Sequence, residues 1–326
     1  MKKGTILSGM RPTGKLHMGN YLTLRNWVKL QEEYDCFFTI VDWHALTTGY
    51  EQTEDLPQNI KEMALDYLAA GIDPVKSTVF VQSQVKQHAE LHLLMSMITP
   101  LGWLERCPTY KEQLRQISDR EIQTYGFLGY PVLQAADIAI YKANAVPVGQ
   151  DQIPHLELAR EIVRRFNFLY GETLVEPEAI LNNAPLLPGT DGRKMSKSYG
   201  NYIALSDEPA KVAQLISQMV TDPARIKKTD PGHPDICTVF AYYGAFTPGM
   251  TEQVRTECEG AQIGCVACKK RLAGEIGAIL EPIHERRRYF AADPQLVEDI
   301  LSRGAESARL AAEETMVKVR AAVRLR

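Results

Sequence analysis

The chain has 326 residues, of which 45% are hydrophobic and 24% charged, and its formal net charge is −3 at pH 7. This composition is typical of a globular protein and excludes a disordered chain, a collagen-like repeat and a small disulfide-rich domain. No apolar run approaches the ~20 residues that span a bilayer, and the N-terminal apolar stretch is too short for a signal peptide. We therefore expect a cytoplasmic protein of about two domains, with cysteines that are not paired in disulfides.

The first half of the chain alternates short apolar runs with helical patterns. Three runs rich in β-branched and aromatic residues predict buried strands. They lie at Gly4–Ser8, Cys36–Asp42 and Thr78–Gln82. Helices are predicted at Tyr21–Glu32 and at Pro57–Ala70, where Gly71 follows as a stop signal. This alternation predicts an α/β fold with a parallel sheet and a ligand crevice at the carboxyl ends of its strands.

The second half is predicted to be mainly helical. A long surface loop is indicated from Pro185 to Tyr202, where Gly, Pro, Asp and Ser occur without periodicity. The stretch from Ala305 to Leu325 has no Pro or Gly and predicts a long terminal helix. Short basic runs such as Lys269–Arg271 occur near this end. Most such runs are solvated helix faces, and contact with nucleic acid is the alternative interpretation.

A candidate phosphate-binding turn follows the first predicted strand, in the sequence SGMRPTGKLHMGN from Ser8 to Asn20. Its glycines and proline indicate a tight strand–turn–helix junction, which presents backbone N–H groups to an anion. His17 and Asn20 could donate to a phosphate, and Gly19 would let an adenine ring approach the backbone. A plain strand-to-helix turn could have a similar composition.

A second candidate site is the pentapeptide KMSKS, at residues 194–198 of the predicted loop. Lys194 and Lys197 lie three residues apart and could clamp the outer phosphates of a triphosphate. The pentapeptide alone would be interpreted as a solvated basic loop. HMGN after the first strand and KMSKS far downstream together resemble the signature of class I aminoacyl-tRNA synthetases, with Asn20 where the commonest form has a second histidine.

Within that class, the chain resembles the tryptophanyl-tRNA synthetases over nearly its whole length. The segments that carry the resemblance are Ser8–Asn20, Asp42–Thr47 (DWHALT), Gly129–Ile138 (GYPVLQAADI), Val146–Arg160 (VPVGQDQIPHLELAR) and Gly192–Ser198 (GRKMSKS). The resemblance implies a Rossmann-like catalytic domain at 1–190 and a helical, anticodon-binding domain at 191–326. Its terminal helix is expected to pack back on the catalytic domain. It also implies a homodimer that joins tryptophan to tRNA(Trp) with ATP and Mg²⁺.

The resemblance also implies which residues bind ATP. They are Arg11, Pro12, Thr13, His17, Gly19, Asn20, Gly149, Gln150, Asp151, Lys194, Met195, Ser196, Lys197 and Ser198. His17, Asn20, Lys194 and Lys197 would stabilise the transition state, and Lys111 matches a lysine that reaches the phosphates. Many relatives have Glu at the position of Gln150.

Asp137 is the candidate residue for recognition of the indole ring. An indole has one polar atom, its N–H, so its pocket needs one buried acceptor, and Asp137 stands among Ala and Ile residues. A helix-capping role for this Asp is the alternative. By resemblance, the other contacts of the amino acid are Tyr130, Gln152, His44, Gln134, Val146 and Val148. Gln134 departs from the Met of many bacterial relatives.

Four cysteines form a third constellation. Cys237, Cys258, Cys265 and Cys268 have the spacing C-x20-C-x6-C-x2-C. Four thiolates can hold a [4Fe–4S] cluster or Zn²⁺, and a chance cluster of buried cysteines is also possible from the residues alone. A bacterial subgroup of the resembled family carries a [4Fe–4S] cluster on a similar pattern, whose long spacer has two more residues. The resemblance therefore favours iron–sulfur over zinc.

Two other functions fit parts of the pattern. A non-catalytic RNA-binding or redox-sensing paralogue could retain the cysteines and lack aminoacylation, although His17, Asn20, Lys194, Lys197 and Asp137 are all present. A tyrosine-charging enzyme would share the class signature. Pyrophosphate exchange with tryptophan, with tyrosine and without amino acid distinguishes the three.

Overall fold

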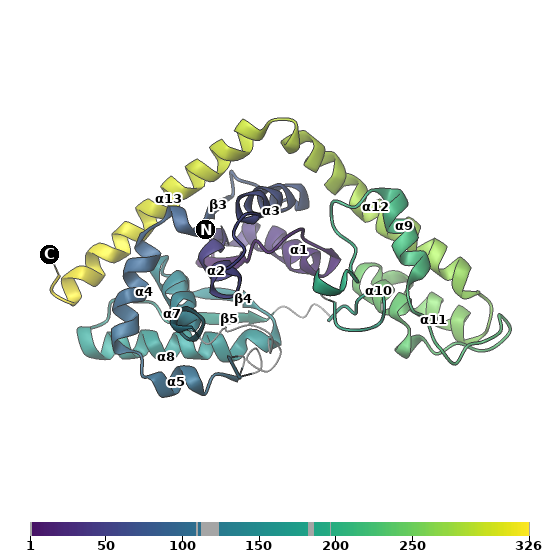
Figure 1. Cartoon of the computed structure of the whole chain (residues 1–326), viewed down its shortest axis with the longest axis horizontal. Coiled ribbons are helices and arrows are strands. Elements are labelled where there is room, and N and C mark those ends of the chain that lie inside the picture. Colours follow the sequence, from purple (N-terminus) through teal and green to yellow (C-terminus); the bar gives the residue numbers. More distant parts are fainter. Residues whose placement is uncertain (1, 109, 112–123, 182–185, 196, 326) are drawn as a thin grey trace.

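The computed structural model describes residues 2–108, 110–111, 124–181, 186–195 and 197–325 (Figure 1). In this part, five parallel strands form one sheet in the order β3-β2-β1-β4-β5. They are β1 (Thr5–Met10), β2 (Asp35–Ile40), β3 (Ser77–Val81), β4 (Ala145–Val148) and β5 (Glu178–Leu181). The order reverses between β1 and β4, which places the expected crevice at their carboxyl ends. The predicted Rossmann-like α/β class is confirmed.

The sheet is surrounded by helices from the first half of the chain. They are α1 (Met18–Glu33), α2 (Asp42–Gly49), α3 (Leu56–Ala70), α4 (Gln87–Ile98), α5 (Leu101–Glu105), α7 (Tyr125–Ile140) and α8 (Ile153–Tyr170). The prediction of β2 as far as Asp42 is wrong, because that residue begins α2. Its carboxylate accepts from the backbone N–H groups of Trp43 and Ser83, both at 3.0 Å, which turns the chain out of the strand.

The second half is helical, as predicted. Its helices are α9 (Pro209–Gln218), α10 (Thr238–Phe246), α11 (Thr251–Glu259), α12 (Cys265–Ala291) and α13 (Pro294–Ala322). Figure 1 shows α12 rising from this group and α13 returning across the sheet. The terminal helix begins eleven residues before the predicted Ala305, because Asp293 caps it by accepting from the Leu296 N–H at 3.1 Å. Pro294 suits its first turn.

Two apolar clusters cover the two faces of the sheet. One contains Ile6 with residues of α1 and α3 and continues into α9, α10 and α12. The other contains Leu7 with residues of α4, α7, α8 and α13. In α13, a Cβ at Gly304 would lie 1.9 Å from the carbonyl oxygen of Val79, so only glycine lets this helix approach β3 so closely. None of the helices described is long and apolar enough to cross a membrane.

Candidate active site

A cavity of about 920 Å³ opens at the carboxyl ends of β1 and β4. Segments far apart in the chain meet there, and they include most of the predicted site residues. Those that line it are Arg11, Thr13, His17, Gly19, Asn20, His44, Tyr130, Gln134, Asp137, Val146, Val148, Gly149, Asp151, Gln152, Lys194, Met195 and Lys197. The structure therefore brings the candidate ATP turn, the KMSKS loop and the candidate indole pocket around one space.

Three of the residues predicted to bind ATP do not line this cavity among those described. Pro12 is buried inside the turn, and Gln150 is exposed at the start of the short helix η2 (Gln150–Gln152). Lys111 is also exposed and lies outside the cavity wall. Ser196 and the side chain of Ser198 lie outside the described residues.

His17 caps the N-terminus of α1 at the candidate ATP turn. Its Nδ1 accepts from the backbone N–H of Asn20 at 3.3 Å, and the Asn20 side chain accepts from the His17 N–H at 3.1 Å. Burial and then the nearby charge of Lys197 lower the pKa of His17 to about 4. The ring is therefore neutral at pH 7, with its proton on Nε2. It can donate a hydrogen bond to a phosphate oxygen without carrying charge.

The KMSKS loop folds over this turn. The Lys197 Nζ lies 3.0 Å from the carbonyl oxygen of Gly14 and 3.3 Å from Thr13 Oγ1. Burial lowers the pKa of Lys197 to about 8. Asn201 braces the loop by donating to Asp191 Oδ1 at 2.7 Å and to the Lys194 carbonyl at 3.2 Å. Two lysines of the loop thus line the cavity on the side of the turn.

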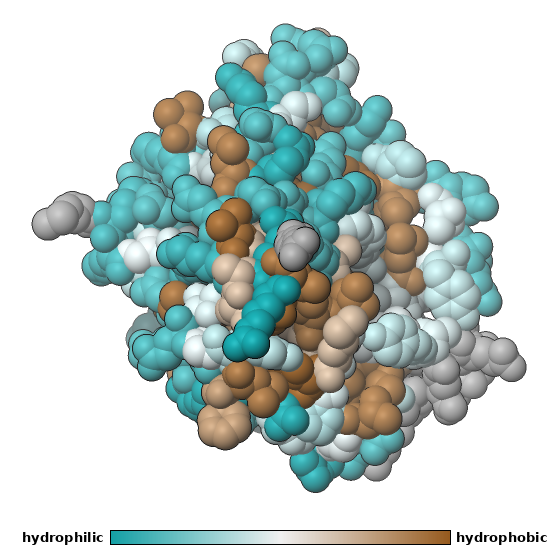
Figure 2. All heavy atoms as spheres, turned by 90° about the vertical axis from the view of Figure 1, so that its left-hand side faces the viewer, coloured by the Kyte–Doolittle hydropathy of each residue, from teal (hydrophilic) through white to brown (hydrophobic). Residues whose placement is uncertain are grey.

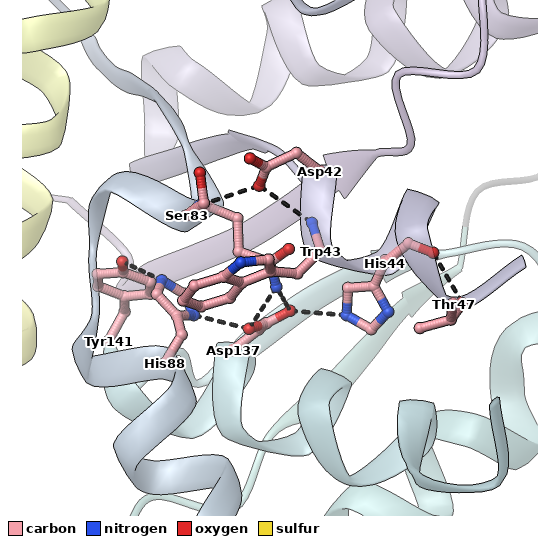
Figure 3. Close-up of polar contacts among 9 residues, drawn as sticks. Asp42, Trp43, His44, Thr47, Ser83, His88, Asp137 and Tyr141 are labelled. Carbon is pink, nitrogen blue, oxygen red and sulfur yellow. Dashed lines mark hydrogen bonds and ion pairs between the residues drawn. The ribbon is translucent and has the colours of Figure 1, made fainter. Parts of the chain in front are cut away.

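Asp137 is buried in α7 and lies at the centre of a hydrogen-bond network (Figure 3). His44 Nε2 donates to it at 2.9 Å and His88 Nδ1 at 2.6 Å, from opposite sides in Figure 3. Gln82 Nε2 lies 2.9 Å and 2.8 Å from its two oxygens. Burial alone would raise the pKa of Asp137, but the charge and hydrogen bonds of the two histidines lower it below its usual range. Asp137 is therefore an ionised acceptor at the end of the cavity.

A second network lines the cavity at the start of α8. Tyr130 Oη and His155 Nε2 are 2.6 Å apart, and His155 Nδ1 lies 3.0 Å from Gln152 Oε1. Burial lowers the pKa of His155 to about 4, so this ring is neutral at pH 7. Its Nδ1–H donates to Gln152, and Nε2 accepts the Tyr130 hydroxyl proton. The Tyr130 oxygen is then left with lone pairs, which suit a substrate ammonium group.

Sequence reasoning did not single out Gln82, His88 and His155. His155 lies in the segment Val146–Arg160, three residues after Gln152, so the sequence spacing predicts that both lie on one helix face. Gln82 directly follows β3, at the edge of the sheet where a site is expected. His88 gives no local signal, because only the packing of α4 on α7 brings it to Asp137.

Comparison with known proteins agrees with this geometry. The family model of the class I tRNA synthetases for tryptophan and tyrosine (W and Y) matches residues 1–281. The chain belongs to this family. A tryptophan–tRNA ligase of Thermotoga maritima is 53% identical over 324 residues, which cover 98% of this chain and 99% of that protein. One of Aquifex aeolicus is 45% identical over 392 aligned positions, covering 98% and 99%.

A solved structure matches the whole fold of this synthetase chain. The crystal structure of tryptophanyl-tRNA synthetase from Campylobacter jejuni, complexed with ADP and tryptophan, has a TM-score of 0.87 at 34% identity. The match covers 98% of this chain and all of that one. The resemblance predicted from the sequence motifs is confirmed.

The four distal cysteines lie outside the synthetase cavity, on three neighbouring helices. Cys237 stands at the N-cap position of α10, Cys258 lies in the last turn of α11, and Cys265 and Cys268 occupy the first turn of α12. Burial and then the neighbouring Cys237 raise the pKa of Cys268 to about 11, and Cys237 and Cys265 also act on Cys258. Within the part of the chain that is described, no group of His, Cys, Asp and Glu side chains is arranged to hold a metal ion.

Proposed function

We propose that this synthetase is a tryptophan–tRNA ligase, which forms tryptophanyl-adenylate and pyrophosphate from L-tryptophan and ATP and then charges tRNA(Trp). The observation that carries the proposal is Asp137, an ionised carboxylate whose cavity also contains the ATP turn and the KMSKS loop. The apolar wall of this cavity includes Ile138, Val146 and Val148. One acceptor among apolar walls suits an indole, whose only polar atom donates.

The proposed chemistry is adenylyl transfer by positioning and charge stabilisation. The tryptophan carboxylate is already ionised and attacks the α-phosphorus of ATP, supplied as its Mg²⁺ complex, and pyrophosphate leaves. Neutral His17 and Asn20 donate to phosphate oxygens, and Lys194 and Lys197 offset the charge that grows on the leaving group. No side chain has to remove a proton in this step. A hydroxyl of the terminal ribose of the tRNA then attacks the adenylate carbonyl, the bond from this carbonyl to the phosphate breaks, and AMP leaves as the hydroxyl proton is released.

The amino-acid end of tryptophan is proposed to lie against the Tyr130–His155–Gln152 network. The Tyr130 oxygen accepts from the α-ammonium group, because its own proton is held by His155. Gln152 and His44 complete the contacts, and Gln134 lies one turn before Asp137 on the pocket wall.

Pyrophosphate exchange tests the function directly. We expect exchange of labelled pyrophosphate into ATP with tryptophan and none with tyrosine or without amino acid. Exchange with tyrosine would reassign the substrate. No exchange by a folded enzyme that still binds tRNA would favour the non-catalytic RNA-binding alternative.

We also propose that Cys237, Cys258, Cys265 and Cys268 hold a [4Fe–4S] cluster, with Zn²⁺ as the alternative. The support is their chemistry and their position: four free thiols lie at the ends of three helices, of which α10 packs against both α11 and α12. The bound cluster or zinc ion would cross-link α10, α11 and α12. Adenylate formation does not require this metal site. These helices would form part of the tRNA-binding domain proposed for residues 191–326, beside the catalytic domain at 1–190.

The surface next to these cysteines suits an RNA backbone in part. Lys269 donates to the Ser217 carbonyl at 2.9 Å, and Arg271 pairs with Glu257 at 2.7 Å. Lys270, between these two residues in the sequence, is exposed and can contact an RNA phosphate.

Replacing Cys268 with Ser should abolish bound iron and absorbance near 400 nm and lower tRNA charging at least tenfold. Exchange with tryptophan should stay within about threefold, because the cavity lies in the other half of the chain. Cys36→Ser, which removes a buried free thiol from β2, is the matched control and should keep its iron. Anaerobically purified enzyme with one zinc and no iron per chain would contradict the cluster. Loss of pyrophosphate exchange in a folded Cys268→Ser variant would contradict the proposal that the cysteine site serves tRNA binding and not adenylate formation.

A homodimer is proposed for the cytoplasmic enzyme, from an apolar face opposite the helical domain. Large apolar side chains are exposed on α4, α5 and the end of α8, and α4 packs against α8 and α13. They include Leu93 (54% exposed), Met97 (70%), Leu101 (62%) and Phe168 (86%). Figure 2 shows apolar atoms gathered on this face. A second copy of the chain would cover such a patch in an isologous interface.

Met97→Lys should convert the enzyme to a monomer in light scattering at micromolar concentration, because a charge would enter the apolar face. Met97 is exposed in the single chain, so its replacement should leave the melting temperature of the monomer unchanged. Tyr289→Lys on α12, a residue 67% exposed outside this face, is the matched control and should stay dimeric. A wild-type monomer, or a dimeric Met97→Lys variant, would refute this interface.

A further inference from the structure

A second groove, of about 760 Å³, lies at the edge of the sheet opposite the active site. Its floor includes Thr5, Asp35 and Ser77, which are the first residues of β1, β2 and β3. Because the strands are parallel, this amino edge is separated from the catalytic cavity by the length of the sheet. Helix α13, which passes over β3 in Figure 1, forms the opposite wall.

Three cations stand at this groove without a carboxylate partner. Arg303 and Lys142 line it, and Lys318 follows on the face of α13 that carries Arg303, Ser307 and Ala311. No carboxylate in the described part of the chain lies within 4.0 Å of their charged nitrogens, whereas Lys76 on the rim pairs with Glu32 at 2.8 Å. Arg303 donates only to the Asp299 carbonyl, at 3.2 Å.

Lys318 is a near neighbour of Lys142, and both side chains carry an ammonium group that can only donate. Burial, and after it this second ammonium group, lowers the pKa of Lys142, and Glu314 opposes the shift. Two like charges held together repel each other unless an anion lies between them. The arrangement therefore favours binding of a small anion.

Lys142 also occupies a backbone position that suits glycine better. Its φ is +50°, in the left-handed region, directly after the C-cap of α7, with its N–H donating to the Ala139 carbonyl at 3.0 Å. Glycine is preferred at such helix ends because a Cβ is strained there. A lysine here costs stability relative to glycine, which makes its side chain a candidate for a functional role.

An aromatic pair stands beside these cations. Phe37 is half-buried, lines the groove and stacks on Tyr141, with ring centroids 4.4 Å apart and planes at 19°. Aromatic rings next to cations suit a planar base that carries a phosphate. Asp35 and Glu314, also on the groove wall, disfavour a long polyanion such as an RNA strand.

We propose that this groove binds a free nucleoside phosphate, with Lys142, Lys318 and Arg303 around the phosphate and the base against Phe37. The site is separate from the ATP site of adenylate formation. It does not depend on the proposed amino-acid specificity.

Equilibrium dialysis with radiolabelled ADP tests the proposal on the full-length enzyme. We expect two ADP molecules per wild-type chain, one in the groove and one in the catalytic cavity. Lys142→Gly should lose one of them, and Lys197→Ala, in the catalytic cavity, should weaken the other. Because glycine suits φ +50°, Lys142→Gly should melt at the same or a higher temperature than the wild type, so loss of binding cannot be attributed to unfolding.

Three further measurements decide the outcome. Lys318→Gln should weaken groove binding at least fivefold, whereas Lys211→Gln, which removes an exposed lysine on α9, should leave it unchanged. In a Lys197→Ala background, ADP should bind more tightly than pyrophosphate, and Phe37→Leu should remove that difference.

A Lys142→Gly variant that binds ADP with wild-type stoichiometry would overturn the site. Equal affinity for pyrophosphate and ADP would overturn the nucleoside assignment. Exchange activity of Lys142→Gly, expected to be normal, keeps this test independent of the catalytic function.

Discussion

Replacing Asp137 with Asn is expected to lower kcat/KM for tryptophan in pyrophosphate exchange by about 10³-fold, a size typical of sites that lose a buried hydrogen-bond partner of the substrate. The reason lies in the donors that surround this side chain. His44, His88 and Gln82 all point N–H groups at Asp137, and an amide would turn a fourth donor toward them. The indole N–H would then lose its acceptor, while the KM for ATP should change less than threefold.

The control for this variant is Gln134→Met, one turn earlier on α7. It changes the pocket wall without removing the acceptor, so we expect a change in the KM for tryptophan of only a few-fold. Thermal melting of both variants separates a local effect from unfolding, since the Asn variant leaves buried donors unpaired at about 1–3 kcal/mol each. Near-normal exchange with tryptophan by a folded Asp137→Asn variant would show that another group recognises the indole.

The elements that could be predicted from the sequence are those whose signal is local. The helix at 57–70 has an apolar face at helical spacing, and Gly71 ends it at φ +108°. HMGN and KMSKS are short local motifs, each ambiguous alone, and together they indicate the synthetase class. Their meeting across Lys197 and Thr13 adds what neither shows alone.

The parts that could not be predicted depend on packing between distant segments. Asp137 could be selected as an acceptor, but its ionised state depends on His88, which α4 brings from about fifty residues away. Pro131 lies inside α7, although a proline at such a position predicts the end of a helix from sequence alone. The helix continues through it because α7 is packed against α4 and α8. The predicted start of α13 is too late because Gly304 precedes the Gly-free stretch, whereas in the structure Gly304 lies inside the helix and packs against β3.

Replacing Lys197 with Ala is expected to lower kcat for adenylate formation about 10²–10³-fold, the usual effect of removing one group that stabilises transition-state charge. The KM for tryptophan should change little, because the lysine lies at the turn and not at Asp137. Lys194→Ala should act in the same direction. An equal loss of ATP affinity and of rate would show that Lys197 only binds ATP in the ground state.

The protonation of Lys197 gives a second, independent test of its contact with ATP. Its pKa in the free enzyme is about 8 because burial disfavours the ammonium form, so at pH 9 the amine is mostly neutral. The phosphates of bound ATP would raise that pKa, and binding at pH 9 should therefore take up nearly one proton, whereas binding at pH 7 should take up almost none. Calorimetry in buffers of different ionisation enthalpy measures this uptake. Lys197→Arg should bind ATP without uptake at either pH, since a guanidinium stays charged. Proton uptake that persists in the Lys197→Arg variant would show that another group takes up the proton. It would contradict the proposed contact between Lys197 and the ATP phosphates.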